Sequence, residues 1–525
     1  MNLATRLRPI AWALLFLPLY VTSQSASDSL VRWADLSFQT PFERAAFSGY
    51  ANGQTKDATA VLLSMSASPA ADQTRWNEQL TRCLNSLHAS GNLSKKNDKK
   101  IKYIYQQVHN QFLTEYRAEN RFHEIIHNGY YNCVTATALY ALVFEKLAIP
   151  YSIQEKPTHV YLIAYPGREN ILVESTSPAS GFLSFDPAFK SNYVKVLKEQ
   201  KIIGPAEATS QNTDELFNKY YFSDEDITLE QLLGIHYAND ALFKQDRNDW
   251  VGAHEQIKKS YWFYPSPRSE FLLTRFAVQR LAEEKKPLSR ATLIGQLARF
   301  EKAGISADMI KGEFSNLTLD VLLKNNEKDV YEKCYAEVIR QIDVPELKKE
   351  IAYIYFYENG RVYHNQGNHV RAKHFFGQAL AQQPNNADLG GIFVNSLVQS
   401  FRNERNNRAV IDSLDRYQAK HPALRENSNF NSFLAFTCIR ASGDAFHSGD
   451  AATGEKYQKR FEELHAADPS LNVVQQAVGY GYSEACVYYF KRGQKTKAKL
   501  ALDKGLQFAP DDFQLKMRKQ MIQGG

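Results

Sequence analysis

The chain lacks the features that identify several large classes of protein. It contains no Gly-x-x-x-x-Gly-Lys run, and no Gly-x-Gly-x-x-Gly run follows a predicted strand, so nucleotide binding has little support. Its formal net charge is only +6 over 525 residues, with the cations interpreted as spread along the chain, so we expect no nucleic-acid partner. Beyond the N-terminal region no apolar run approaches the length of a spanning helix, so we expect no membrane span in the mature chain.

Cysteine is scarce and scattered, which excludes two further classes. No Cys-x-x-Cys pair and no paired spacing is present, so the sequence predicts neither a disulfide framework nor a cysteine zinc site. His123 and His127 lie four residues apart, but no third ligand is evident, and we expect no metal. An odd number of cysteines leaves at least one thiol free. The five are Cys83, Cys133, Cys334, Cys438 and Cys486.

The N-terminus reads as an export signal. Arg6 and Arg8 precede an apolar stretch from Ile10 to Val21, and small residues follow it. This pattern predicts a signal peptide over residues 1–23 and a secreted or periplasmic protein. The alternative is an uncleaved anchor.

The chain is too long for a single compact core, and its pattern changes along its length. Residues 28–95 are predicted to form an N-terminal helical segment. A helical spacing follows, and then an apolar helix from Cys133 to Leu147, with Asn132 as its N-cap and Pro150 beyond its end. The helical spacing is carried by Ile101, Ile104, Tyr105, Val108, Phe112 and Tyr116.

Two strands are predicted after this helix. Residues 158–165 and 170–174 alternate in polarity around the turn 166–169 and indicate a hairpin. If Tyr165 faces Asn170, then Tyr161 faces Glu174. His159 would then lie diagonally from Glu174 on the same face of the sheet, within reach of a long side chain. A slip of one residue would place the two on opposite faces.

From about residue 230 a helical pattern recurs to the end of the chain. Small residues, aromatics and a closing proline stand at matching offsets, and this pattern resembles the tetratricopeptide repeat. The resemblance implies an all-α solenoid over residues 230–525 that binds a protein or peptide partner. The alternative is a generic helical bundle. Two copies match well, at Gly367, Ala372, Leu380 and Pro384 and at Gly493, Ala498, Leu506 and Pro510, and a third copy has Asn248, Ala253, Tyr261 and Pro265.

Three residue types in this order suggest a thiol nucleophile. Cys133 begins a helix, where unpaired N–H groups favour a thiolate and can hold an oxyanion. His159 is the candidate base, and Glu174 is the candidate acid that orients the ring. Asp186 is a rival acid, and we favour Glu174 because it ends a strand beside the histidine strand.

The segment that carries these residues resembles the transglutaminase-like superfamily, relatives of papain-type cysteine proteases. In that superfamily a helix-opening cysteine precedes a strand histidine and a strand acid. The resemblance covers roughly residues 100–200 and implies an α+β module over residues 96–215 with Cys133, His159 and Glu174 as catalytic residues. Members commonly carry Asp-Pro-Thr at the acid position, where this chain has Glu174-Ser175-Thr176. The matching pieces are residues 132–139, 147–150, 158–160 and 173–176.

Two functional hypotheses follow. In the first, the module forms a thioester with a protein or peptide amide and passes the acyl group to water or to an amine, with no metal or organic cofactor. In the second, the module is a degenerate domain without activity, and the chain is a binding scaffold. The sequence leaves open whether the site is active.

Overall fold

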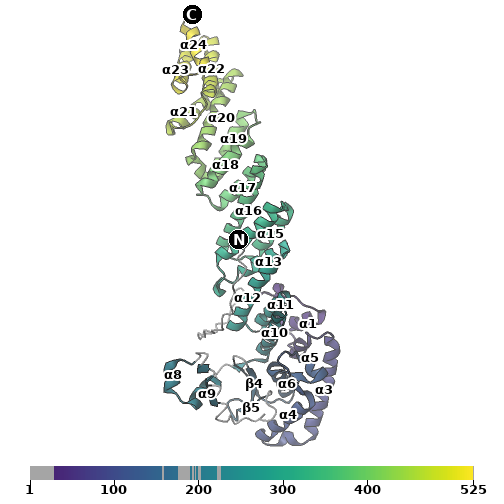
Figure 1. Cartoon of the computed structure of the whole chain (residues 1–525). Helices are drawn as coiled ribbons and strands as arrows, with labels where there is room; N and C mark the ends of the chain where they lie inside the picture. The colour runs from purple at the N-terminus through teal and green to yellow at the C-terminus, as the bar shows by residue number, and fades with distance from the viewer. Residues whose placement is uncertain are drawn as a thin grey trace. The chain divides into compact units, whose positions relative to one another are not determined.

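The structure is a computed structural model, and it describes residues 29–156, 159–174, 190–191, 194–195, 197–198, 203–221 and 226–523. The predicted signal peptide and Asp186 lie outside these residues. The chain divides into two compact units, Met1–Glu283 and Glu284–Gly525 (Figure 1). It is mostly helical, with a small sheet region in the first unit and only helices described in the second. Helices α10 to α12, which follow the sequence-derived boundary at residue 230, belong to the first unit.

The first unit combines helices with two small sheets. Its helices are α1 (Pro41–Ala51), α2 (Ala58–Leu63), α3 (Pro69–Ala89), α4 (Asn97–Phe112), α5 (Phe122–Asn128), α6 (Cys133–Lys146), α8 (Pro205–Ser210), α9 (Thr213–Tyr221), α10 (Leu229–Asp246), α11 (Trp250–Phe263) and α12 (Pro267–Glu283), with short 3-10 turns η1 (Trp33–Asp35) and η2 (Asn92–Ser94). Its strands are β1 (Glu115–Tyr116), β2 (Tyr130–Tyr131), β3 (Tyr151–Lys156), β4 (His159–Ala164), β5 (Ile171–Val173) and β6 (Asp226–Ile227).

The larger sheet has the order β5-β4-β3-β6, and all its pairs are antiparallel. Leu162 pairs with Val173 and Ala164 with Ile171, and the N–H of Asn170 donates to the carbonyl of Tyr165. The hairpin and the register predicted from the sequence are therefore confirmed. This register sets the strand positions of the candidate site.

Both faces of strand β4 are buried, because its residues alternate between two clusters. Val160, Leu162 and Ala164 belong to the large core of the unit, which also contains most of α6. Tyr161 points to the opposite face and packs with Leu216 and Phe217 of α9. The sheet therefore lies between α6 and the segment around α9 (Figure 1).

Helix α6 is the central helix of this core. Every residue from Val134 to Phe144 is buried, as expected for a helix that is apolar nearly all round. The side chain of Asn132 accepts from the Thr135 N–H at 3.0 Å, and the Thr135 hydroxyl accepts from the Asn132 N–H at 2.9 Å. This reciprocal cap confirms the predicted start of the helix at Cys133.

The helix predicted around residue 101 ends earlier than its spacing suggested. Helix α4 stops at Phe112, and Tyr116 lies on strand β1, where it pairs with Tyr131 in a parallel two-stranded sheet. Half of the Tyr116 surface is exposed, so its inclusion in the apolar face of the helix was wrong. A residue four positions beyond the helix end can match the helical period by chance.

Helices α10 and α11 complete the core of the first unit. Tyr237 and Phe263 belong to the same apolar cluster as α6 and the sheet. Lys259 of α11 forms a buried ion pair with Glu43 of α1 at 2.6 Å, and Tyr237 donates a hydrogen bond to the same carboxylate. These contacts fasten the N-terminal helical segment to α10 and α11 within the unit.

The second unit is built from helices joined by short turns. Its helices are α13 (Pro287–Leu297), α14 (Ala307–Thr318), α15 (Lys328–Gln341), α16 (Pro345–Asn365), α17 (His369–Gln382), α18 (Ala387–Ser400), α19 (Asn407–Lys420), α20 (Ser428–His447), α21 (Ala451–Ala467), α22 (Gln475–Lys491), α23 (Lys495–Phe508) and α24 (Phe513–Gln523), with 3-10 turns η3 (Glu301–Ala303) and η5 (Pro422–Glu426) and a π-helical turn η4 (Leu319–Lys324).

The same turn joins successive helices at several places. Gly367, Gly449 and Gly493 each have a φ between +71° and +89°, and each is followed by an N–H that donates back to a carbonyl five residues earlier. Asn248 occupies the same position, with a φ of +60°, between α10 and α11 of the first unit. Glycine and asparagine tolerate this left-handed conformation better than other residues. A repeated helical hairpin is therefore present at the positions where the sequence shows its matching copies.

Among the described residues, no helix is both long enough and apolar enough to cross a membrane.

Candidate functional site

The surroundings of Cys133 differ from those of the other four cysteines. All five thiols are free, and Cys133 alone among them is not fully buried. Burial raises the pKa of Cys83 and of Cys334 to about 11 and that of Cys438 to about 12. Those thiols stay protonated and inaccessible at neutral pH, so Cys133 is the thiol placed for chemistry.

The start of α6 offers donors beside this sulfur. The Thr135 N–H is used by the side chain of Asn132, and the Ala136 N–H donates to the Asn132 carbonyl. The N–H groups of Cys133 and Val134 lie in the first turn of α6, where the helix has no carbonyl group that could accept a hydrogen bond from them. They point out of the helix end, where a partial positive charge favours an anion.

His159 and Glu174 meet as the predicted register requires. Nε2 of His159 lies 2.7 Å from Oε2 of Glu174. The pairing of Leu162 with Val173 continues to Tyr161 opposite Glu174, so His159 and Glu174 are diagonal neighbours on one face. The carboxylate is almost fully buried, whereas about a quarter of the histidine side chain is exposed.

The side chain of Cys133 also interacts with the ring of His159. Since Nε2 is directed at Glu174, Nδ1 is the nitrogen left for the sulfur. Burial alone would lower the pKa of the ring, but the hydrogen bonds to Cys133 and Glu174, together with their charges, raise it to about 10. The three predicted residues therefore form one chain of contacts, sulfur to imidazole to carboxylate.

Aromatic residues surround this chain of contacts. The His159 ring stacks against Tyr161, with ring centroids 6.0 Å apart and an interplanar angle of 24°. The Tyr105 hydroxyl donates to the carbonyl oxygen of Glu174 at 3.0 Å and so fixes the backbone that carries the carboxylate. Burial, and then the charge of Glu174, raise the pKa of Tyr105 to about 12, so its phenol remains a donor at neutral pH.

Tyr116 is an exposed neighbour of Cys133. Its ring packs edge-on against Tyr131 at 5.8 Å. Burial is the first cause of its raised pKa, and the charge of the nearby Cys133 is the second. Half of its surface is open to solvent.

A loop with one buried residue, Asn120, supports the first turn of α6. Oδ1 of Asn120 accepts from the Thr135 hydroxyl at 2.9 Å, and the side-chain amide of Asn132 donates to the carbonyl of Ala118 at 3.1 Å. Arg121, next in the chain, forms a salt bridge with the buried Asp240 at 2.6 Å. This network ties the N-cap to α10 and limits movement of the helix end.

Sequence reasoning missed three of these residues. Tyr105 was assigned only to the apolar face of a helix, Tyr116 was placed on the wrong element, and Asn120 has no motif around it. A buried asparagine in a loop gives no local signal, because its partners are fixed by tertiary contacts.

The two histidines four residues apart have another role. Nε2 of His127 lies 2.7 Å from Oδ1 of Asp72, and the ring of His123 is 6.0 Å from that of His127. Within the described part of the chain, no group of three or more His, Cys, Asp or Glu side chains is arranged to hold a metal ion.

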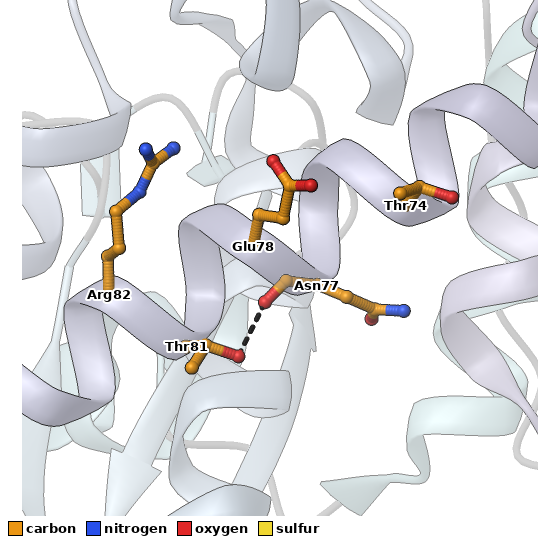
Figure 2. A pocket seen from close by; sticks show the side chains of 5 residues that line it. All are labelled: Thr74, Asn77, Glu78, Thr81 and Arg82. Atoms are coloured by element: carbon orange, nitrogen blue, oxygen red, sulfur yellow. Dashed lines mark hydrogen bonds between the residues drawn. The ribbon is translucent and has the colours of Figure 1, made fainter.

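A separate pocket opens over the surface of α3 (Figure 2). Its described lining consists of Thr74, Asn77, Glu78, Thr81 and Arg82, all from this one helix. The Thr81 hydroxyl donates to the Asn77 carbonyl at 2.7 Å, an ordinary contact within a helix. None of the three candidate residues is among them, and we assign the pocket no role.

No protein-family model matches the chain, and no curated protein matches it. The residues of the site are therefore the basis for inferring a function.

Proposed function

We propose that the first unit is a transglutaminase-like cysteine domain that forms a thioester with a protein or peptide amide. Cys133 is the nucleophile, His159 is the general base and acid, and Glu174 orients the ring. The observation that carries this proposal is the 2.7 Å contact between Nε2 of His159 and Oε2 of Glu174. The same imidazole ring also interacts with the side chain of Cys133.

In the proposed reaction each of the three groups has one role. Before the attack His159 holds the proton of the Cys133 thiol as an imidazolium, and the sulfur, as a thiolate, attacks the carbonyl carbon of an amide. The carbonyl oxygen becomes an oxyanion next to the N–H groups at the start of α6. As the carbon–nitrogen bond breaks, His159 gives its proton to the leaving amine and a thioester remains on the sulfur.

The second half of the reaction releases the acyl group. Water or a primary amine attacks the thioester carbonyl while His159 takes its proton. The carbon–sulfur bond then breaks, and the thiol regains its proton from the ring. Glu174 stabilises the imidazolium in both halves, because its carboxylate is buried and within hydrogen-bond distance of Nε2.

We propose further that the second unit is a tetratricopeptide-type array that binds the protein or peptide on which the first unit acts. Its support is the recurrent hairpin with a left-handed glycine at Gly367, Gly449 and Gly493. Small residues fit where the two helices of such a hairpin approach each other. Ala372 and Ala498 each lie five residues after the glycine of their turn, and both are fully buried. Stacks of this kind present extended binding surfaces.

The test is to trap the acyl intermediate. The native chain is incubated with a library of glutamine-containing peptides, quenched in acid and analysed by intact-protein mass spectrometry. We expect an acyl adduct that hydroxylamine removes, that is absent from Cys133→Ala and that is present in Cys83→Ala, which removes a buried thiol. Addition of a primary amine distinguishes transfer from hydrolysis by the product formed.

Absence of an acyl adduct would favour the scaffold hypothesis. If the native chain forms no adduct with any peptide in the library and Cys133 alkylates no faster than free cysteine, the proposal fails. The scaffold hypothesis, a domain that retains the fold without the reaction, would then replace it.

A further inference from the structure

The positive charge of the chain is concentrated at its C-terminal end. Residues 491–525 contain nine of the 63 Lys and Arg residues but only three of the 57 acidic ones. The remaining residues carry 54 of each sign and are formally balanced. The interpretation of the cations as evenly spread is therefore wrong, and the excess of +6 belongs to the region of α23 and α24.

Many of these cations have no ion-pair partner in the part of the chain that the structure describes. Lys504 and Lys516 pair with Glu462 and Asp511 at 2.7 and 2.9 Å. Lys497 pairs with Glu455 at 3.9 Å. Four other lysines are exposed and make no such contact among the described residues. They are Lys491, Lys495, Lys499 and Lys519.

Large apolar side chains are exposed on the same helices as these cations. Phe513 is 73 % exposed and Met517 43 % exposed, and because they lie four residues apart they share one side of α24. Leu500 on α23 and Phe490 at the end of α22 are about half exposed. The three helices α22, α23 and α24 pack on one another. We define the C-terminal surface as the exposed residues Phe490, Lys491, Lys495, Lys499, Leu500, Phe513 and Met517 of these three helices.

We propose that the C-terminal surface docks an acidic segment of another protein that also carries apolar side chains. Unpaired cations attract an acidic partner by charge complementarity and speed its approach. Binding of a partner that buries the exposed Phe, Leu and Met side chains lowers the free energy, because it removes apolar surface from water. A surface that combines the two features fits an acidic amphipathic segment, with apolar anchors inside and carboxylates at the rim.

The apolar component argues against a purely electrostatic ligand. A polyanion such as nucleic acid needs cations along its backbone, and its affinity falls steeply with salt. Leu500 and Met517 would remain exposed in such a complex. This inference is independent of the proposed reaction, because it uses no residue of the first unit.

The test uses the full chain and labelled synthetic peptides in fluorescence anisotropy. The first peptide is an 18-residue amphipathic helix, a length of about 27 Å, with leucine and phenylalanine on one face and glutamate on the other. The second has lysine in place of each glutamate, and the third keeps the glutamates but has alanine on the apolar face. We expect the first to bind at least about tenfold more tightly than either of the others.

Two sets of variants locate the binding site. Phe513→Ala with Met517→Ala tests the apolar anchor, and a triple change of Lys491, Lys495 and Lys499 to Glu tests the charge. Each is expected to weaken the first peptide by about tenfold. All five positions are exposed, so the fold should survive, which circular dichroism verifies.

Matched controls come from elsewhere in the second unit. Val370→Ala removes an apolar side chain that is 60 % exposed on α17. A triple change of Lys302, Lys333 and Arg405 to Glu alters the same amount of charge at other exposed positions. Both controls should bind the first peptide as the native chain does.

Several results would overturn the proposal. Equal affinity for the lysine peptide would remove the electrostatic argument, and equal affinity for the alanine-faced peptide would remove the apolar one. Competition by single-stranded DNA or by anionic vesicles at matched charge would identify a general polyanion surface instead. Weakening by the control variants would place the peptide elsewhere.

Discussion

At the scale of single residues, the site depends on the hydrogen bond between an imidazole and a half-buried sulfur. The ring of His159 has a pKa of about 10 and is therefore protonated at neutral pH beside the side chain of Cys133. An imidazolium next to sulfur favours the thiolate, which is the reactive form. The four other thiols are buried and lack such a partner in the described contacts.

Alkylation tests this pair directly. Iodoacetamide should modify Cys133 in the native chain at pH 7 at least about tenfold faster than in His159→Gln, because the variant lacks the proton acceptor. The measurement is the rate of label incorporation at Cys133 by peptide mass spectrometry. The two rates should converge at high pH, where the thiol ionises without help. Equal rates at pH 7 would disprove the coupling.

The raised pKa of His159 also predicts how stability changes with pH. Folding raises the pKa of the ring from its ordinary 6.5 to about 10, so the folded state retains the proton more strongly. The stabilising contribution is complete below about pH 6.5 and is lost as pH rises through about 10. The difference in unfolding free energy between the native chain and His159→Gln should therefore shrink over this interval.

Urea unfolding of both proteins at pH 6, 8 and 10 measures this difference. Lysine and tyrosine side chains that titrate near pH 10 are common to the two proteins and cancel in the comparison. A difference that stays constant across the three pH values would show that His159 does not hold its proton in the folded state.

At the scale of elements, the cap of α6 links stability to reactivity. Asn132 satisfies the Thr135 N–H, and Asn120 holds the Thr135 hydroxyl in place. Asn132→Ala should cost about 1–2 kcal/mol in unfolding free energy, the usual effect of losing a side-chain cap, with an added cost for the buried amide. It should also slow alkylation of Cys133, because the helix end would fray.

The control for the cap is the equivalent change at another helix. Asn386 caps α18 in the second unit through the Leu389 N–H at 3.0 Å. Asn386→Ala should destabilise its own unit by a similar amount and leave the alkylation rate unchanged. If both variants slow alkylation equally, the effect is general loosening and not a property of the cysteine helix.

The turn between helices gives a second prediction at this scale. Gly367 has a φ of +71°, and alanine in that conformation costs about 1 kcal/mol or more. Gly391, inside α18, has an ordinary φ and nothing within 4 Å of an added Cβ. Gly367→Ala should therefore lower the unfolding free energy of the second unit, whereas Gly391→Ala should raise it by roughly 0.4–1 kcal/mol. Chemical denaturation measures both, and effects of the same sign would contradict the argument.

Local patterns predicted the elements better than the contacts between them. The cap at Asn132 and the pairing of Tyr165 with Asn170 follow from rules that act over a few residues, and both are confirmed. The end of α4 was misjudged, because Tyr116 matches the helical period although it lies on a strand. Asn120 and Tyr105 act through residues distant in sequence, and no local pattern carries that information.

At the scale of the whole molecule, the chain has two compact units with separate cores. The core of the first contains α6, the sheet and α10, and a large cluster in the second extends from Tyr363 to Leu515. Each unit therefore has the apolar burial that a domain needs to fold by itself. The distribution of charge follows the same division, because the excess of +6 lies within the second unit.

Two substitutions should therefore act on different unfolding transitions. Glu43→Leu leaves the buried Lys259 ammonium of the first unit without its partner and should cost roughly 3–5 kcal/mol. Phe376→Ala removes a fully buried ring from the core of the second unit and should cost a similar roughly 3–5 kcal/mol. Differential scanning calorimetry should show one transition lowered by each single variant and the other unmoved. In the double variant the two losses should add, because the sites belong to different units with separate cores. A single transition that both substitutions lower would mean that the units unfold together, and the two cores would then have to be treated as one cooperative structure.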